Sequence, residues 1–295
     1  MTARITLSTA SVYPESCEQT FRYAADYGYD GVEVMVTTDP VTQDTAAVAE
    51  LSRRFGVPTT SIHAPCLLIT QFVWGTDPTE KLRRSVRMAD DLGAGVVVIH
   101  PPFRWQRDYA DGFLDLVEEL SSAGGAQVSV ENMFPWWVPG RRMGAYAPDW
   151  DPRTFTTPHV TLDVSHCAAA QVECTAMASD LSGRLRHVHL TDGSGSAKDE
   201  HLVPGHGNQP VAALVTSLGA AGFDGDIVLE LNTRRVDPRV RASNLAESMS
   251  FIRTALLRSG RFGIAVSGGG TADLIDLSAA DDPLAAAEPA AAGIA

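Results

Sequence analysis

Short β-branched runs alternate with longer amphipathic segments along most of the chain. Eight such runs follow one another, RITLST, GVEVMV, TTSIHA, VVVIHP, VSVENM, VTLDVS, LRHVHL and DIVLEL. After each run, apolar residues recur every three or four positions, which is the spacing of an amphipathic helix. This order of elements is typical of a parallel sheet whose strands are joined by helical crossovers.

The predicted helices are marked by residues that favour helix ends. The segment TDPTEKLRRSVRMADDLGA has Thr or Asp at its start, Pro near the first turn and Gly at its close. Further helices are expected over residues 16–27, 42–55, 109–123, 167–182, 210–221 and 238–259.

Eight strand and helix units in about 260 residues match the size of a (β/α)8 barrel. A doubly wound open sheet is the alternative, but no GxGxxG follows the first strand, and polar strand ends occur along the whole chain. We therefore predict a single (β/α)8 TIM barrel over residues 1–259. Residues 260–295 are rich in Gly, Ala and Pro, so a low-complexity, largely disordered tail is expected, in which TADLIDL could dock as a short element.

The charge balance and the cysteines restrict the class of protein. A formal net charge of −13 argues against broad nonspecific binding to nucleic acid or anionic membranes, which requires clustered Lys and Arg. No stretch approaches the roughly 18 apolar residues of a membrane span, and the start MTARITLSTASVYPES lacks the apolar core of a secretory signal. The four cysteines form no CxxC pair, which suits a reducing compartment. A cytoplasmic location is expected, and no particular oligomeric state is predicted.

Polar residues occur at the carboxyl ends of the predicted strands. In a (β/α)8 barrel these ends meet at one mouth, where active sites are normally built. Two more, Asp199 and His201, come from the stretch KDEHLVPGHGN after the seventh strand. The ten imidazole and carboxylate groups directed at this mouth are Glu33, His63, His100, Glu131, Asp163, His166, His189, Asp199, His201 and Glu230.

Such a set predicts a divalent-metal centre, because buried carboxylates that lie close together repel one another unless cations neutralise them. The mixture of imidazole nitrogen and carboxylate oxygen suits Zn²⁺ or Mn²⁺. Cys66 and Cys167 lie next to these residues in the sequence, and both are interpreted as small buried apolar residues.

The order and spacing of these motifs over residues 4–258 resemble the xylose isomerase-like barrel superfamily, which includes endonuclease IV and sugar phosphate isomerases and epimerases. The resemblance to the endonuclease IV branch implies a three-metal site in which Glu131 bridges two ions. The ligands that it implies are His63, His100, Glu131, Asp163, His166, His189, Asp199, His201 and Glu230.

The epimerase branch of the superfamily implies one metal and a smaller ligand set. It needs Glu131, Asp163, His189 and Glu230, with His166 touching the substrate. This subset is also complete. It leaves four of the nine residues without a role, and the Arg that this branch commonly carries after the seventh strand is missing from HVHLTDGSGSAKDEHL.

Two features depart from endonuclease IV, namely the Trp-rich loop FPWWVPGRRMGAYAPDW and His206 in PGHG, so the metal site carries over while the DNA substrate does not. The resemblance favours hydrolysis of a small phosphorylated sugar or polyol with up to three Zn²⁺ or Mn²⁺ ions. Its catalytic residues would be Glu131, Glu230 and His166. The alternative is a sugar or sugar phosphate isomerase or epimerase with one divalent metal and a Glu131/Glu230 acid–base pair. An abasic-site DNA endonuclease and a noncatalytic metal-binding barrel rank lower.

Loop residues beyond the strand ends are candidates for substrate contact. Arginines there could clamp a phosphate, and tryptophans could stack on the apolar faces of a sugar. Both residue types also occur as solvated loop charges or as apolar caps of a barrel. The candidates are Glu33, Trp74, Arg104, Trp105, Trp136, Trp137, Arg141, His206 and Arg234.

Overall fold

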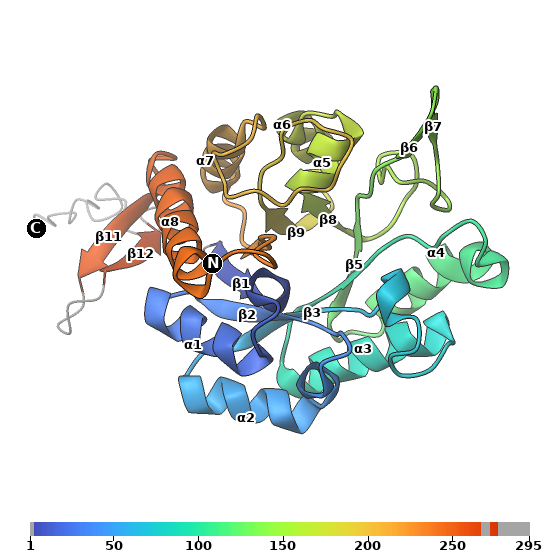
Figure 1. Cartoon of the computed structure of the whole chain (residues 1–295), viewed down its shortest axis with the longest axis horizontal. Coiled ribbons are helices and arrows are strands. Elements are labelled where there is room, and N and C mark those ends of the chain that lie inside the picture. The colour runs from blue at the N-terminus through green and yellow to red at the C-terminus, as the bar shows by residue number, and fades with distance from the viewer. Residues whose placement is uncertain (1–2, 267–271, 277–295) are drawn as a thin grey trace, which may run out of the picture.

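The computed structural model describes residues 3–266 and 272–276. Its eight parallel strands are β1 (Arg4–Ser8), β2 (Gly31–Met35), β3 (Thr59–His63), β4 (Val96–Ile99), β5 (Gln127–Glu131), β8 (His159–Asp163), β9 (Leu185–Leu190) and β10 (Asp226–Leu229). They close into a barrel in the order β1-β10-β9-β8-β5-β4-β3-β2. Figure 1 shows helices outside the strands. Each strand overlaps one of the eight β-branched runs, which confirms the predicted (β/α)8 barrel.

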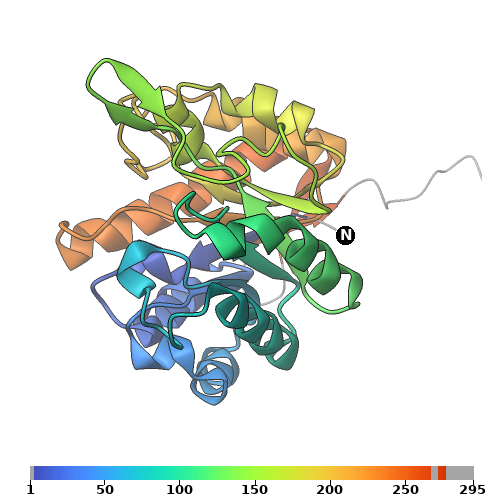
Figure 2. The same cartoon turned by 90° about the vertical axis from the view of Figure 1, so that its right-hand side faces the viewer.

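Helices surround these strands, as Figure 2 shows from the side. The α-helices are α1 (Cys17–Tyr27), α2 (Thr45–Phe55), α3 (Pro78–Leu92), α4 (Arg107–Ser122), α5 (Val164–Ala170), α6 (Cys174–Asp180), α7 (Val211–Ala221) and α8 (Pro238–Leu257). Three 3-10 turns are η1 (Thr9–Val12), η2 (Pro40–Gln43) and η3 (Leu68–Thr70). At α3 the Asp77 side chain accepts hydrogen bonds from the first-turn amides, and Gly93 ends the helix with a φ of 70°. None of the helices described is long and apolar enough to cross a membrane.

The single helix predicted over residues 167–182 is instead the pair α5 and α6. The first helix starts directly after β8, because the Asp163 carboxylate accepts the backbone N–H of His166 at 2.7 Å and caps it. Gln171 then adopts a left-handed φ of 57°, which ends α5. The early start places His166 in the first turn, next to the end of β8.

Two antiparallel strand pairs lie outside the barrel. In the Trp-rich loop, β6 (Trp136–Val138) pairs with β7 (Arg141–Met143), a hairpin that the sequence analysis did not predict. In the segment expected to be a tail, β11 (Phe262–Val266) pairs with β12 (Ala272–Asp276), which contains most of TADLIDL. Residues 267–271 and 277–295 of the predicted tail lie outside the described residues.

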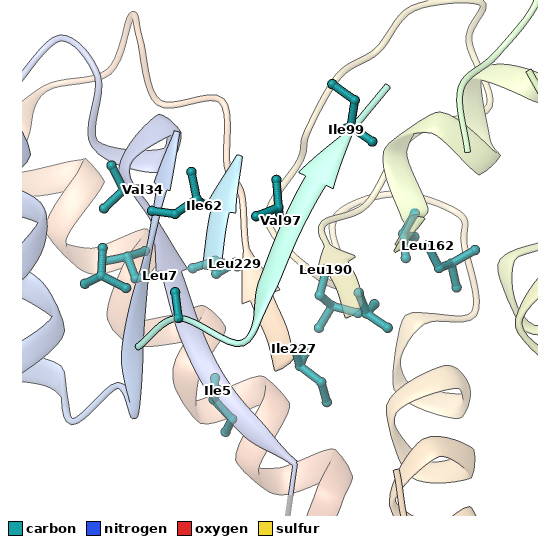
Figure 3. Packing of buried hydrophobic residues seen from close by; sticks show 14 of the residues in the cluster. Ile5, Leu7, Val34, Ile62, Val97, Ile99, Leu162, Leu190, Ile227 and Leu229 are labelled. Carbon is teal, nitrogen blue, oxygen red and sulfur yellow. The ribbon is translucent and has the colours of Figure 1, made fainter. Parts of the chain in front are cut away.

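Side chains alternate between two environments along the barrel strands, as the period of a strand requires. Residues of one parity belong to the main apolar cluster, which includes Leu7, Val34, Ile62, Val97, Leu162, Leu190 and Leu229 (Figure 3). The other parity faces the barrel interior and includes the buried polar residues Thr6, Glu33, Ser61, Ser129, Thr161 and His187. The interior is therefore polar just below the carboxyl ends of the strands.

Candidate metal centre

The nine residues predicted as metal ligands lie together at the carboxyl ends of the strands. Three end a strand and two follow one directly, while the others come from β9, α5 and the loop after β9. Seven of them line a cavity of about 950 Å³, namely His63, His100, Glu131, His166, Asp199, His201 and Glu230. The remaining two, Asp163 and His189, are completely buried. A cavity of this size holds a small organic ligand.

A first group of donors joins β3, β4 and β5. Glu131 Oε2 lies 3.0 Å from His100 Nε2 and 3.4 Å from His63 Nε2. This buried oxygen has no hydrogen-bond partner, so neither ring nitrogen is directed at it as a donor. The other nitrogen of His63, Nδ1, lies 3.0 Å from the Ala64 carbonyl oxygen, which can only accept. Nε2 of His63 is therefore the nitrogen that a metal would take, once its proton is displaced.

A second group surrounds His189. Its Nδ1 lies 2.9 Å from Glu230 Oε2, 3.1 Å from Glu131 Oε1 and 3.6 Å from Asp163 Oδ2. Asp163 Oδ2 is buried without a hydrogen-bond partner. On the other side of the ring, Nε2 lies 3.1 Å from Glu33 Oε1. If Glu33 accepts the Nε2 hydrogen, a lone pair on Nδ1 faces three carboxylates, an arrangement that fits a divalent cation.

A third group joins α5 to the loop after β9. Asp199 Oδ2 lies 2.9 Å from His201 Nε2 and 3.4 Å from His166 Nε2. Both rings donate Nδ1–H to backbone carbonyls, His201 to Glu230 at 2.7 Å and His166 to Asn132 at 2.8 Å. Nε2 of both rings is thereby turned toward the same carboxylate, where a cation could displace their protons.

Buried polar contacts hold the loop that carries Asp199 and His201. The Ser165 hydroxyl donates to Asp199 Oδ1 at 2.7 Å and accepts the backbone N–H of His201 at 2.9 Å. The carboxylate of Asp192 accepts backbone N–H groups of Gly205 and Gly207 at 3.0 Å each. The stretch KDEHLVPGHGN is therefore ordered by side chains that the sequence analysis did not single out.

Glu33 lies behind His189 and does not line the cavity. It is fully buried, and its Oε2 accepts hydrogen bonds from Ser61 Oγ at 2.9 Å and His187 Nε2 at 2.8 Å. Glu33 lies below the cavity because the register of β2 against β3 aligns it with Ser61, two residues before the end of β3. This position corrects the expectation that Glu33 contacts substrate and makes it the residue that orients His189.

Substituting Glu33→Gln is expected to weaken divalent-metal binding about 10-fold to 100-fold, because partners of ligating histidines fix the ring and raise its basicity. Calorimetric titration of Mn²⁺ into metal-free protein measures the change. Glu247→Gln, a surface substitution on α8, serves as the control. Equal affinities in the wild type and the Glu33→Gln variant would show that Glu33 does not support a ligand.

Opposite charges dominate the electrostatics of these groups. Burial lowers the pKa of His100, but Cys66 and Glu131 raise it to about 9. Burial likewise lowers the pKa of His166, whereas Asp163 and Asp199 raise it to about 10. For Glu131, burial raises the pKa, yet His189 and His100 hold it well below its usual range. Protons on the histidines therefore neutralise the carboxylates in the metal-free protein.

Metal binding is accordingly expected to release protons. At neutral pH, below the pKa values of about 9 for His100 and about 10 for His166, a cation must displace a proton from each ring that it binds. The apparent affinity should rise with pH toward that range, about tenfold per pH unit for each displaced proton. Titrations of Mn²⁺ or Zn²⁺ in buffers of different ionisation enthalpy count these protons, and an affinity independent of pH would contradict the assignment.

Some residues predicted to contact substrate lie at the mouth of the barrel. Arg234 lines the main cavity, with its guanidinium over the ring of Tyr13 at 5.3 Å. Trp105 stacks on Phe103 with ring centroids 4.3 Å apart and lines a smaller cavity of about 190 Å³ that His100 also lines. Trp136 packs against the same two rings.

Other residues predicted to contact substrate line neither the smaller cavity nor the main one, and their role stays a prediction. The guanidinium of Arg84 lies 4.5 Å from the ring of Trp74, and Trp137 donates its indole N–H to the Ala169 carbonyl at 3.1 Å. His206 is 55% exposed and contacts Glu247 of α8 at 2.9 Å. Arg104 and Arg141 are exposed and line neither cavity. Loop contacts between residues distant in sequence determine these positions.

Cys66, which was interpreted from the sequence as a packing residue, lies beside the first group of donors. Its sulfur and the ring nitrogens of His63 and His100 all lie within 4.8 Å of one another. Burial raises the pKa of its thiol, but His100 and His63 lower it to about 6. The signal for this arrangement was present in SIHAPC, where His and Cys are three residues apart.

Known proteins share this fold and much of this sequence. A family model described as xylose isomerase-like TIM barrel matches residues 21–255. An uncharacterized protein of Mycobacterium leprae (strain TN) is 49% identical over 275 residues, which cover 86% of this chain and 98% of the relative. The fructoselysine 3-epimerase of Shigella flexneri is 24% identical over 259 residues, which cover 78% of this chain and 91% of the relative.

Among solved structures, a D-tagatose 3-epimerase-like protein superposes with a TM-score of 0.63 at 21% identity, covering 87% of this chain and 98% of that chain. Likeness at this level of identity establishes a common fold. The match of the family model establishes family membership as well as fold, because it covers most of the barrel and includes the ends of seven of the eight strands. The chain belongs to the xylose isomerase-like TIM barrel family.

Proposed function

We propose that the chain is a metal-dependent sugar epimerase or isomerase that moves a proton at the carbon beside a sugar carbonyl. The observation that carries this proposal is the placement of Glu131 and Glu230. Both line the cavity, and they come from β5 and β10, which flank β8 and β9 on opposite sides. The relationship to a fructoselysine 3-epimerase supports the same reaction class. The cytoplasmic location stays a prediction.

The second donor group would hold the essential metal, with Glu131, Asp163, His189 and Glu230 as its ligands. A divalent cation bound there would polarise the sugar carbonyl and a neighbouring hydroxyl, which makes the C–H bond between them more acidic. Mn²⁺ or Zn²⁺ would suit this mixture of one imidazole and three carboxylates.

Glu131 and Glu230 would then transfer the proton. One carboxylate accepts it from the substrate carbon, and the other, in its protonated form, returns a proton to the opposite face. Burial raises the pKa of Glu230, but His189 keeps it below its ordinary value, so an ionised base is available at neutral pH. His166, whose Nε2 faces the cavity, would hold a sugar hydroxyl.

The test is product formation from a panel of ketoses that includes fructoselysine, D-tagatose, L-ribulose and their phosphate esters. Each is incubated with the Mn²⁺-loaded protein, and the sugars are separated by chromatography. Formation of an epimer or of the corresponding aldose supports the proposal. Unchanged sugars throughout the panel, with release of phosphate from the esters, would favour hydrolysis.

Phosphoester hydrolysis, which the sequence analysis favoured, is the second candidate. The observation in its favour is that the first and third donor groups offer ligands for two cations beyond the one that epimerisation needs. With three cations, one would generate hydroxide and the others would bind the phosphate. Hydrolysis requires the third group, so the double substitution Asp199→Ala and His201→Ala should abolish phosphate release and lower the metal content.

A further inference from the structure

We propose that Cys66 is a metal ligand, and that His63, Cys66, His100 and Glu131 form a second cation site that takes a thiophilic ion such as Zn²⁺. The three donors from His63, Cys66 and His100 lie within 4.8 Å of one another. The proposal goes beyond epimerisation, because the metal used in that reaction is assigned to the group around His189.

The donor atoms are close to the geometry of a bound ion. Zinc bonds of about 2.0–2.3 Å to nitrogen and sulfur place neighbouring tetrahedral donors about 3.3–3.8 Å apart. Glu131 Oε2 already lies 3.0 Å from His100 Nε2 and 3.4 Å from His63 Nε2. Since all distances to the sulfur are below 4.8 Å, a shift of about an ångström closes the site.

The backbone explains why a thiol reaches the two rings. Cys66 donates its backbone N–H to the Ala64 carbonyl at 2.8 Å, which makes a tight turn centred on Pro65 directly after β3. The same carbonyl accepts the Nδ1 hydrogen of His63 at 3.0 Å. One carbonyl oxygen thus fixes both the ring orientation of His63 and the turn that presents Cys66.

A carboxylate oxygen without a hydrogen bond lies at the same place. Glu131 Oε2 is buried and has no hydrogen-bond partner, although two imidazole nitrogens are within reach. A buried carboxylate oxygen that receives no hydrogen bond is costly, and a cation bound between it and the two rings would remove that cost.

The two sites differ in chemical hardness. Sulfur and two imidazoles suit a soft or borderline ion, whereas the group around His189 has three carboxylates and one imidazole, which also suits Mn²⁺. Glu131 would join them, with Oε2 toward the first ion and Oε1 toward the second. Zn²⁺ would be bound by the Cys66 thiolate, and the protons that it displaces from the rings of His63 and His100 would pass to solvent.

The experiment uses Co²⁺ as a spectroscopic substitute for Zn²⁺ in the full-length protein. The wild type should develop a thiolate-to-cobalt charge-transfer band in the near ultraviolet that saturates at one ion per chain. The variant Cys66→Ser should lose the band. Its affinity for Zn²⁺ at this site should fall by at least about 10-fold to 100-fold, the loss that removing even an outer partner of a ligand causes. Cys174→Ala, which removes a buried thiol of α6, is the matched control and should keep the band.

Absence of the band in wild-type protein that has bound at least two cobalt ions would overturn the proposal, and so would its persistence in Cys66→Ser. Thiol labelling of the wild type gives a measurement that needs no variant. Zn²⁺ should slow modification of Cys66 at least tenfold, and equal labelling rates with and without Zn²⁺ would also overturn the proposal. Neither readout involves turnover, so failure of the epimerase proposal is distinguishable from failure of this one.

Discussion

Replacing Glu131 by Gln is expected to lower turnover by about 10³-fold to 10⁴-fold, and Glu230→Gln should have a similar effect. Each substitution removes a carboxylate that would carry a proton and would bind the metal, and proton transfer by a positioned side chain alone contributes about 10²-fold to 10⁴-fold. The measurement is kcat with the best substrate of the ketose panel under saturating Mn²⁺.

Glu247→Gln is the matched control, since Glu247 pairs with His206 at the surface of α8. It should retain the activity of the wild type. If Glu131→Gln kept more than about a tenth of wild-type turnover at equal metal content, an acid–base role for Glu131 would be ruled out.

Replacing His189 by Ala is expected to lower the free energy of unfolding of the metal-free protein by about 3–5 kcal/mol. Removing one partner of a buried ionic group leaves the others unpaired, and here the ring separates Glu33 from three more carboxylates. The loss should shrink as the pH falls, because protonation of the carboxylates relieves their repulsion.

Urea denaturation of the wild type and of the His189→Ala variant measures the difference. His206→Ala is the control. It should change the free energy of unfolding by less than about 0.5 kcal/mol, because the His206 side chain is exposed at the surface. An equally small change for His189→Ala would mean that the carboxylates are not held by this ring.

The barrel could be predicted because each strand carries its own signal. In strands such as VTLDVS and DIVLEL, every second residue is apolar and packs against the helices. The residues between them must then face the barrel interior, because side chains alternate along a strand. Since the carboxyl ends of all eight strands meet at one mouth, His63, Glu131 and Glu230 could be placed together without knowledge of the loops.

Depth within the barrel could not be predicted in the same way. The side chain of Glu33 points into the barrel, as those of the cavity residues do. The stagger of β2 against β3 aligns it with Ser61, so it lies deeper in the barrel than the cavity, behind His189. Barrel stagger is a property of the closed sheet, and no single strand encodes it.

Loop residues escaped prediction because their partners are distant in sequence. His206 faces Glu247, 41 residues away, and Trp137 is held by the carbonyl of Ala169. The break between α5 and α6 depends on a left-handed Gln171, a conformation usually signalled by Gly or Asn. Cys66 was interpreted as a packing residue because it was considered apart from His63, three residues earlier.

The proposed proton transfer is tested most directly by solvent exchange. A ketose that the protein accepts is incubated with it in D₂O, and deuterium in the recovered sugar is located by NMR. We predict that one deuterium enters at the carbon beside the carbonyl, in both the recovered substrate and its epimer, and that Glu131→Gln and Glu230→Gln do not catalyse this entry. Phosphate release from a sugar phosphate with no deuterium in the recovered sugar would contradict epimerisation and support a hydrolase.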